Sequence, residues 1–93
     1  MAKVKLNLLN IFYLKTNKKA IEYEGTTVGD IISQFIEQHK DKLDDSILSK
    51  NKKKLNSQML VLINGRNIEY LKKYRTKLSD GDEIFLSYPL SGG

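Results

Sequence analysis

The chain opens with apolar and polar residues in alternation. Val4, Leu6 and Leu8 are apolar, whereas the residues between them are polar. Successive side chains of a β-strand point to opposite faces, so this period of two is typical of a strand with one buried face. We therefore predict a first strand over residues 3–9.

A bend and a second strand are predicted next. The apolar pattern becomes irregular from Asn10, which is expected to mark a bend or bulge, and residues 16–18 have the composition of a turn. Alternation resumes over residues 19–24 and stops at Gly25. This pattern favours a second strand that pairs with the first in a hairpin.

The clearest helix in the sequence begins at Thr27. Thr27 and Asp30 have the spacing of a capping box, with aspartate in place of the usual glutamate. Six residues at a spacing typical of helices form one stripe, and five of them are large and apolar. The stripe consists of Val28, Ile31, Ile32, Phe35, Ile36 and His39. We expect this stripe to cover the sheet, with His39 as a helix C-terminal residue rather than a base or a metal ligand.

Residues 40–58 have the least regular pattern. They are mostly polar and include a lysine cluster at 50–54, so we predict one short helix near 44–49 followed by a solvated surface loop. Residues 59–63 (Met-Leu-Val-Leu-Ile) are apolar without interruption. Such a run is typical of a strand that is buried on both faces, which would place this strand in the centre of the sheet.

Turn signals divide the remaining residues. Asparagine followed by glycine at 64–65 is a strong hairpin signal and predicts a short returning strand over residues 66–68. A single helical turn is expected over 70–73. Asp-Gly-Asp at 80–82 has turn composition, because glycine readily adopts positive φ. Residues 83–88 are rich in aromatic and branched residues and predict the last strand.

Pro89 should end this strand, because proline has no N–H to donate to a sheet. We therefore predict a domain over residues 1–88 and a flexible tail over residues 89–93, which ends in Gly92 and Gly93. Without Cβ atoms, the two glycines could enter a narrow enzyme channel, and a nucleophile could approach the last carbonyl unhindered. A frayed chain end is the simpler explanation of terminal glycines. Their position directly after a strand favours the functional explanation.

Composition narrows the possible functions. The 93 residues contain no cysteine, so neither a disulfide nor a thiolate site is possible. No apolar run is long enough to cross a bilayer and no signal-peptide pattern is present, so we expect a cytoplasmic protein. The net charge of +5 is moderately basic and does not by itself predict nucleic-acid binding. No catalytic triad, phosphate loop or zinc-ligand spacing is found, and turn formation explains Asp80 and Asp82 better than a metal does.

The C-terminal third carries a specific set of motifs. Asn-Ile closes a strand at 67–68, an aromatic-Leu pair stands at 70–71, LSDGDEI occupies 78–84, and the chain ends in aromatic-Pro-x-x-Gly-Gly. In these features the sequence resembles MoaD, the small subunit of molybdopterin synthase, which is grouped with ThiS and the ubiquitin-related sulfur carriers. The resemblance implies an α+β fold of the β-grasp (ubiquitin-like) type, with a mixed sheet and one main helix packed across it. It also implies that the first and last strands are parallel neighbours in the centre.

The same resemblance implies a sulfur carrier in molybdenum cofactor biosynthesis. In this family a MoeB- or ThiF-like enzyme uses ATP to adenylate the terminal carboxylate, and sulfur then displaces the adenylate to leave a thiocarboxylate. Gly93 would be the reacting residue, and Gly92 would give access to it. The chain would then be a substrate and not a catalyst, would bind no cofactor itself, and would deliver sulfur through a MoaE-like large subunit.

Alternation along the last strand assigns its side chains to two faces. Ile84 and Leu86 are expected in the core, and Phe85 is expected on the other face as an exposed aromatic residue. MoaD proteins typically have an aromatic residue where this chain has Ser87 and a proline where it has Tyr88, so the identity of the partner stays open. The residues predicted to contact the partner are Phe85, Tyr88, Pro89 and Leu90.

Two other functions stay open. The same tail chemistry could serve thiamine synthesis or tRNA thiolation, or could join the chain to lysines of target proteins as a ubiquitin-like modifier. In a different class, the chain would be a β-grasp module that binds protein or RNA through the lysine cluster at 50–54 and has an inert tail. Removal of Gly92 and Gly93 would abolish carrier activity but leave such a binding module unaffected.

Overall fold

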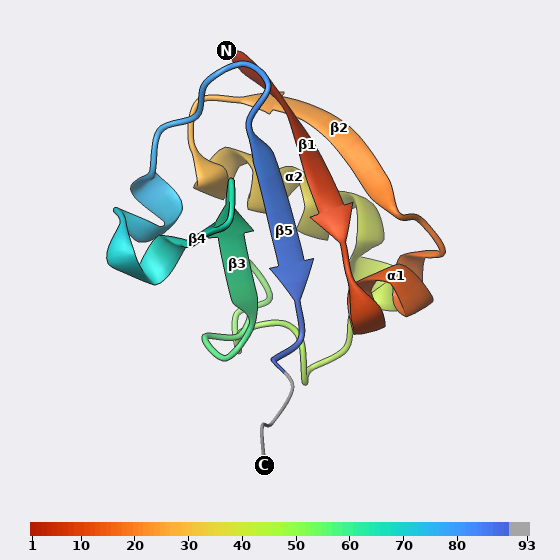
Figure 1. Ribbon diagram of the computed structural model, residues 1–93. Helices are drawn as coiled ribbons and strands as arrows, with labels where there is room; N and C mark the ends of the chain where they lie inside the picture. The colour runs from red at the N-terminus through yellow and green to blue at the C-terminus, as the bar shows by residue number, and fades with distance from the viewer. Residues whose placement is uncertain (90–93) are drawn as a thin grey trace.

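A mixed β-sheet forms the framework of the computed structural model, which describes residues 1–89. Within these residues the strands are β1 (Ala2–Leu8), β2 (Ala20–Gly25), β3 (Leu60–Ile63), β4 (Arg66–Asn67) and β5 (Glu83–Ser87). Their order in the sheet is β2-β1-β5-β3-β4 (Figure 1). β1 and β5 are parallel and the other pairs are antiparallel. The predicted pairing of the first and last strands is therefore confirmed.

The first strand follows its sequence pattern residue by residue. Val4, Leu6 and Leu8 are buried, and the residues between them lie on the other face. β2 pairs with β1 in antiparallel register, with Val4 opposite Tyr23. The Tyr23 hydroxyl donates to Oε1 of Gln38 at 2.7 Å, and burial raises the pKa of Tyr23 to about 12.

The connection between these strands differs from the prediction. The bend at Asn10 is present, but it begins a seven-residue helix, α1 (Asn10–Thr16), instead of an irregular extension of the strand. Phe12 and Thr16 lie one helical turn apart and are both buried. Thr16 donates its hydroxyl to the carbonyl of Phe12 at 2.7 Å, and Asn17 ends the helix in the left-handed conformation. The sequence pattern did not predict α1, because Phe12 is apolar but Thr16, the other buried position, is polar.

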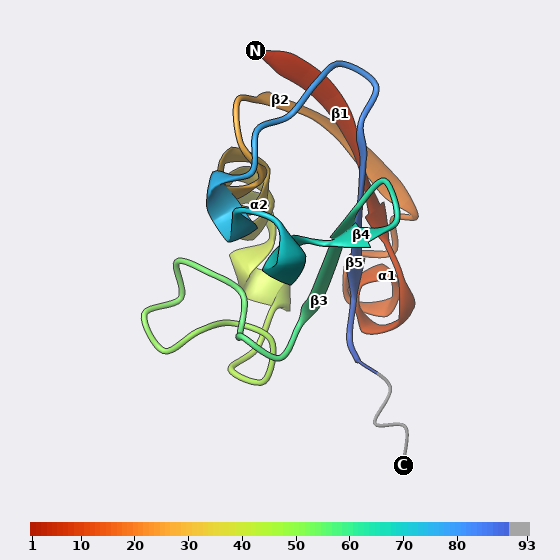
Figure 2. The same cartoon turned by 60° about the vertical axis from the view of Figure 1, so that its left-hand side comes forward.

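The main helix, α2 (Val28–His39), is the one predicted, and it crosses one face of the sheet (Figure 2). Its N-terminus has both halves of the capping box, because Thr27 Oγ1 accepts from the Asp30 N–H at 3.3 Å and Asp30 Oδ2 accepts from the Thr27 N–H at 3.0 Å. All six residues of the predicted stripe are buried. His39 is the last residue of the helix, and its Nδ1 donates to the Phe35 carbonyl at 3.1 Å.

Residues 40–58 contribute more to the core than the predicted surface loop would. The short helix expected near 44–49 is wrong: a single turn is present, in which the N–H groups of Ile47 and Leu48 both bond to the Asp44 carbonyl at 3.0 Å. Four apolar side chains of this segment are buried. They are Leu43, Ile47, Leu48 and Leu55. The lysines at 50–54 are exposed, as predicted.

β3 is buried on one face only, so the prediction of a doubly buried central strand is wrong. Val61 and Ile63 are buried, whereas Leu60 and Leu62 are half-exposed. Its neighbours are β5 and the two-residue edge strand β4, and no described element covers its outer face (Figure 2). The central position belongs to β5.

The hairpin after β3 is confirmed by positive φ at both turn residues, 50° at Asn64 and 87° at Gly65. The single helical turn expected over 70–73 is replaced by two 3-10 turns, Ile68–Tyr70 and Lys73–Arg75. Among the described residues, no helix has the length and apolarity needed to cross a membrane. The fold prediction, an α+β β-grasp sheet crossed by one main helix, is confirmed, while the domain boundary after residue 88 stays a prediction.

Candidate functional site

The candidate site is the end of β5, where the central strand leaves the sheet. Tyr88 and Pro89 are the last described residues, and they follow the strand directly (Figure 1). Tyr88 is 37% exposed and Pro89 is half-buried. Leu90, Gly92 and Gly93, which were predicted as site residues, lie outside the described part of the chain.

The end of β5 is held on both sides. On one side Ser87 is opposite Leu60 of β3, and on the other Leu86 is opposite Leu8 of β1. After these pairs the side chain of Asn10 bonds to Tyr88, the residue that follows β5: its Oδ1 accepts from the Tyr88 N–H at 2.9 Å, and its Nδ2 donates to the Tyr88 carbonyl at 3.1 Å. The base of the predicted tail is therefore anchored to the residue that begins α1.

Asn10 was predicted only as a bend, and its contacts were missed. Its partners are 77 and 78 positions away in the sequence, so no local pattern reports them. The available signal was the residue type, since asparagine tolerates the positive φ of 38° found here and can bond to the backbone through its side chain.

The outer face of the sheet carries an apolar patch beside the end of β5. We define the open apolar patch as Leu60, Leu62 and Phe85, three half-buried side chains on the face opposite α2. Phe85 lies in the middle strand, with Leu62 opposite it on β3 and Asn7 opposite it on β1. Phe85 is therefore on the predicted face, although it is half-buried rather than fully exposed. Its role in partner binding stays a prediction.

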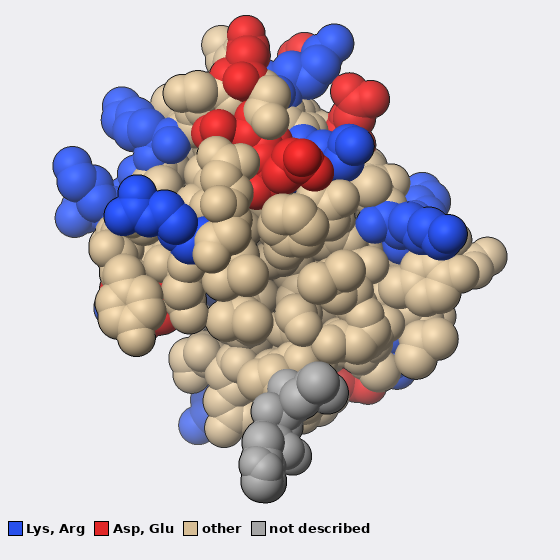
Figure 3. Space-filling model, in the orientation of Figure 1, with Lys and Arg blue, Asp and Glu red and all other residues tan. Residues whose placement is uncertain are grey.

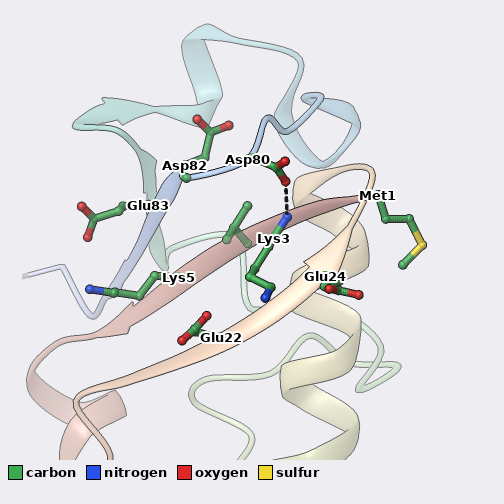
Figure 4. Close-up of a pocket in the computed structure, with 10 residues that line it drawn as sticks. Met1, Lys3, Lys5, Glu22, Glu24, Asp80, Asp82 and Glu83 are labelled. Carbon is green, nitrogen blue, oxygen red and sulfur yellow. Dashed lines mark hydrogen bonds between the residues drawn. The ribbon is translucent and has the colours of Figure 1, made fainter.

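Most charged side chains on this face lie at its other end. In Figure 3 the centre of the face is free of charged residues, and Lys, Arg, Asp and Glu gather towards the end where the N-terminus lies. An open hollow of about 630 Å³ is found there (Figure 4). The charged residues that line it are Lys3, Lys5, Glu22, Glu24, Asp80, Asp82 and Glu83. Because acids and lysines alternate across the strands, this end is a mixed-charge surface.

Asp80 and Asp82 form the turn that precedes β5. Asp80 Oδ1 accepts from the Lys3 N–H at 2.8 Å, and Asp82 Oδ2 accepts from the Ser79 N–H at 2.8 Å. Gly81 between them has a φ of 87°. These bonds support turn formation as the role of both aspartates. Within residues 1–89, no group of three or more His, Cys, Asp or Glu side chains is arranged to hold a metal ion.

The shifted pKa values of the described residues have structural causes. Backbone N–H groups of Thr26 and Thr27 lower the pKa of Asp30, and the Ser46 hydroxyl together with Lys15 lowers the pKa of Asp44. Burial raises the pKa of Tyr74. The partners of Asp30 and Asp44 lie on other elements, whereas Tyr74 lines an open hollow together with Pro89. The described part of the site presents a strand end and an apolar patch.

The β-grasp fold, with a central last strand that leads out of the sheet, is that of the ubiquitin-like carriers and modifiers. The model of the ThiS family matches residues 8–93, and the chain belongs to this family. Proteins of this kind are non-catalytic carriers or modifiers, so the expectation that the chain is not an enzyme by itself is confirmed. A comparison with curated proteins found no match.

Solved structures agree with this assignment. The solution structure of small archaeal modifier protein 1 from Methanosarcina acetivorans is 28% identical, with a TM-score of 0.84 over 100% of this chain and 98% of that chain. A chain of the BexX/CysO complex from Amycolatopsis orientalis is 21% identical, with a TM-score of 0.71 over 97% and 99%. A Pyrococcus furiosus protein described as molybdopterin converting factor subunit 1 is 20% identical, with a TM-score of 0.70 over 97% and 100%. The last two likenesses concern the fold alone.

Proposed function

We propose that this chain is a sulfur carrier whose Gly93 carboxylate is activated by a partner enzyme. The observation that carries the proposal is the route of β5, since the central strand leads from the middle of the sheet, past the open apolar patch, to the anchored residues Tyr88 and Pro89. Membership of the ThiS family supports it. Four residues follow Pro89, and in extended form they would reach at most about 14 Å, enough to enter an active site while the domain stays outside.

The chemistry places the sulfur on the main chain. A carboxylate oxygen of Gly93 attacks the α-phosphate of ATP and pyrophosphate leaves, which gives an acyl adenylate. Hydrosulfide then attacks the carbonyl carbon: the new C–S bond replaces the C–O bond to AMP, AMP leaves, and the thiocarboxylate remains. The chain has no cysteine, so it has no side-chain thiol to compete for the activated carbonyl. The activating enzyme, of the MoeB or ThiF kind, supplies the ATP site, and the chain itself needs no cofactor.

We propose molybdopterin synthesis as the destination of the sulfur, through a MoaE-like large subunit. The motifs of residues 67–93 support this choice. The open apolar patch, together with Tyr88, Pro89 and Leu90, would contact the partner, because uncharged aromatic and aliphatic side chains are the usual anchors of an interface. The cytoplasmic location expected from the sequence stays a prediction.

A second function is favoured by one comparison. Small archaeal modifier protein 1 from Methanosarcina acetivorans is similar to this chain over its whole length at 28% identity, and its name describes a modifier. In that role the adenylated Gly93 would be transferred to the amino group of a lysine in a target protein, with loss of AMP. Thiamine synthesis and tRNA thiolation would use the same thiocarboxylate with other acceptors.

Intact mass spectrometry tests the proposal. The chain is incubated with a MoeB-like enzyme, ATP and a sulfur donor, and we expect one oxygen to be replaced by sulfur at Gly93. A variant without Gly92 and Gly93 should keep its mass unchanged. If the wild-type mass also stays unchanged while the enzyme thiolates its own carrier, the proposal is wrong and the inert-tail binding module is favoured.

A second assay separates the destinations. The thiocarboxylate form is mixed with a MoaE-like subunit and the molybdopterin precursor. Sulfur transfer is monitored by mass spectrometry as the disappearance of the thiocarboxylate mass. Peptide mapping of cell proteins tests the modifier function: trypsin cleaves after Lys77, so a modified lysine would carry residues 78–93 of this chain as a remnant. Transfer to the precursor without remnants would support the first function alone, and remnants without transfer would support the second.

A further inference from the structure

The side chain of Asn10 takes the place of a strand at the end of β5. The parallel pairing of β1 with β5 runs to Leu8 opposite Leu86, and the Leu9 N–H donates to the Leu86 carbonyl at 3.0 Å. At Asn10 the backbone turns into α1, with φ of 38°. The main-chain pairing with β5 therefore ends at Leu86, two residues before Tyr88.

The carboxamide of Asn10 has an acceptor oxygen and an NH2 group with two N–H donors, so it offers both kinds of polar group that a peptide unit has. Oδ1 accepts from the Tyr88 N–H at 2.9 Å and from the Ile11 N–H at 2.7 Å. Nδ2 donates to the Tyr88 carbonyl at 3.1 Å and to Ser87 Oγ at 2.8 Å. The two bonds to Tyr88 reproduce the pair that a neighbouring strand would make, so they continue the ladder by one residue through a side chain.

These contacts fix the chain directly after β5. Both backbone polar groups of Tyr88 are bonded, and the ring of Pro89 restricts the next φ to about −65°. Two consecutive residues thus have little freedom to pivot. The position of Tyr88 is therefore fixed by Asn10, which belongs to the other end of the sequence.

We propose that Asn10 is a positioning residue for the reaction at Gly93. It aims the chain away from the sheet, so that less conformational entropy is lost when the end of the chain enters the activating enzyme. This inference rests on the proposed function, because it assumes that the carboxylate of Gly93 is adenylated. Asn10 does not touch the reacting atoms, and its effect should be seen in KM rather than in kcat.

Asn64 is a matched control at the opposite end of β5. It also has positive φ, 50°, and its Oδ1 also accepts a strand N–H, that of Glu83, at 2.9 Å. Its Nδ2 donates to Asp82 Oδ1 at 2.9 Å. Replacement by glycine removes a comparable side chain at either position and leaves a residue that tolerates positive φ. Asn10→Gly and Asn64→Gly therefore differ mainly in which end of β5 they release.

The test combines amide exchange with kinetics. By NMR, the Tyr88 amide should lose its protection from hydrogen exchange in Asn10→Gly and keep it in Asn64→Gly. In ATP–pyrophosphate exchange with a MoeB-like enzyme, the KM of Asn10→Gly should be about tenfold higher than that of wild type, because the backbone of one more residue must be ordered on binding. Its kcat should be nearly unchanged. Asn64→Gly should stay within about twofold of wild type. All variants are compared at a temperature at which circular dichroism shows them folded.

Asn10→Asp keeps the acceptor for the Tyr88 N–H and loses the Nδ2 donor. Its Tyr88 amide should stay protected, and its KM should lie between those of wild type and Asn10→Gly. If Asn10→Gly does not fold, Asn10→Asp still tests the positioning role. If the wild-type chain is not adenylated at all, the proposed function is wrong. If the wild type is adenylated and both Asn10 variants match it in KM, only the positioning role is overturned.

Discussion

Phe12 of α1 packs against Phe35 of α2, with ring centroids 6.1 Å apart and ring planes inclined by 57°. Tilted contacts of this kind are favourable for aromatic rings. Both side chains are fully buried, so the short helix between β1 and β2 is part of the core. The same helix begins with Asn10, and its attachment to α2 therefore also holds the residue that anchors the end of β5.

We expect Phe12→Ala to lower the free energy of unfolding by about 3–5 kcal/mol, because it leaves a cavity between the two helices. Leu14 lies on the same helix but is 73% exposed, so Leu14→Ala should change stability by less than about 0.5 kcal/mol. Urea denaturation followed by circular dichroism measures both. Equal losses in the two variants would contradict the packing of α1 described above.

Gly25 is constrained by its neighbours at the end of β2. A Cβ atom at this position would lie 2.8 Å from Asp30 Cβ and 3.0 Å from Ile31 Cδ1. Asp30 is held by the capping box and has little room to move. We therefore expect Gly25→Ala to destabilise the protein by about 1–3 kcal/mol, while the exposed neighbour change Glu24→Ala should have a much smaller effect. A thermal melt that is unchanged for Gly25→Ala would contradict this contact.

The capping box should make stability depend on pH. Two backbone N–H groups hold the pKa of Asp30 below its ordinary value of 3.8 in the folded protein. The ionised carboxylate therefore stabilises the fold above the unfolded-state pKa, and this contribution is lost as pH falls through the folded-state pKa. Asp30→Ala should be less stable than wild type at pH 7, and the difference should shrink below about pH 4.

Thr27→Ala is the control for this pH effect. It removes the hydroxyl half of the same capping box and introduces no titratable group. Its urea midpoint should fall below that of wild type at both pH 7 and pH 3, with a weaker pH dependence than that of Asp30→Ala, because the Thr27 side chain is the smallest of the causes that lower the pKa of Asp30. If Asp30→Ala shows the same loss at both pH values, the carboxylate is not the source of the dependence.

Phe85 offers a test of the open apolar patch. We expect Phe85→Ser to weaken binding to the activating enzyme by tenfold or more, on the order seen for central aromatic anchors. Leu14→Ser changes an exposed apolar side chain of α1 that is not one of the residues of the patch, and should bind like wild type. Titration calorimetry measures the affinity of each variant, and urea denaturation checks that Phe85→Ser is still folded. Equal affinities would remove the patch from the interface.

The sequence by itself was enough for elements whose pattern is local. Alternation in β1 and the stripe of α2 report which face is buried, because side-chain direction follows directly from backbone geometry. Thr27 and Asp30 mark the helix start within four residues. The family, and with it the expected role of Gly92 and Gly93, followed from the motifs of residues 67–93; both glycines lie outside the described part of the chain.

Tertiary structure decided what depends on distant neighbours. The burial of Ile47 and the one-sided exposure of Leu62 depend on which faces other elements cover, and no run of apolar letters reports this. Helix α1 is stabilised by Phe12 in the core rather than by a repeated apolar spacing. The bonds from Asn10 to Tyr88 join residues 78 positions apart, and they form only because parallel pairing brings both ends of the chain to the centre of one sheet.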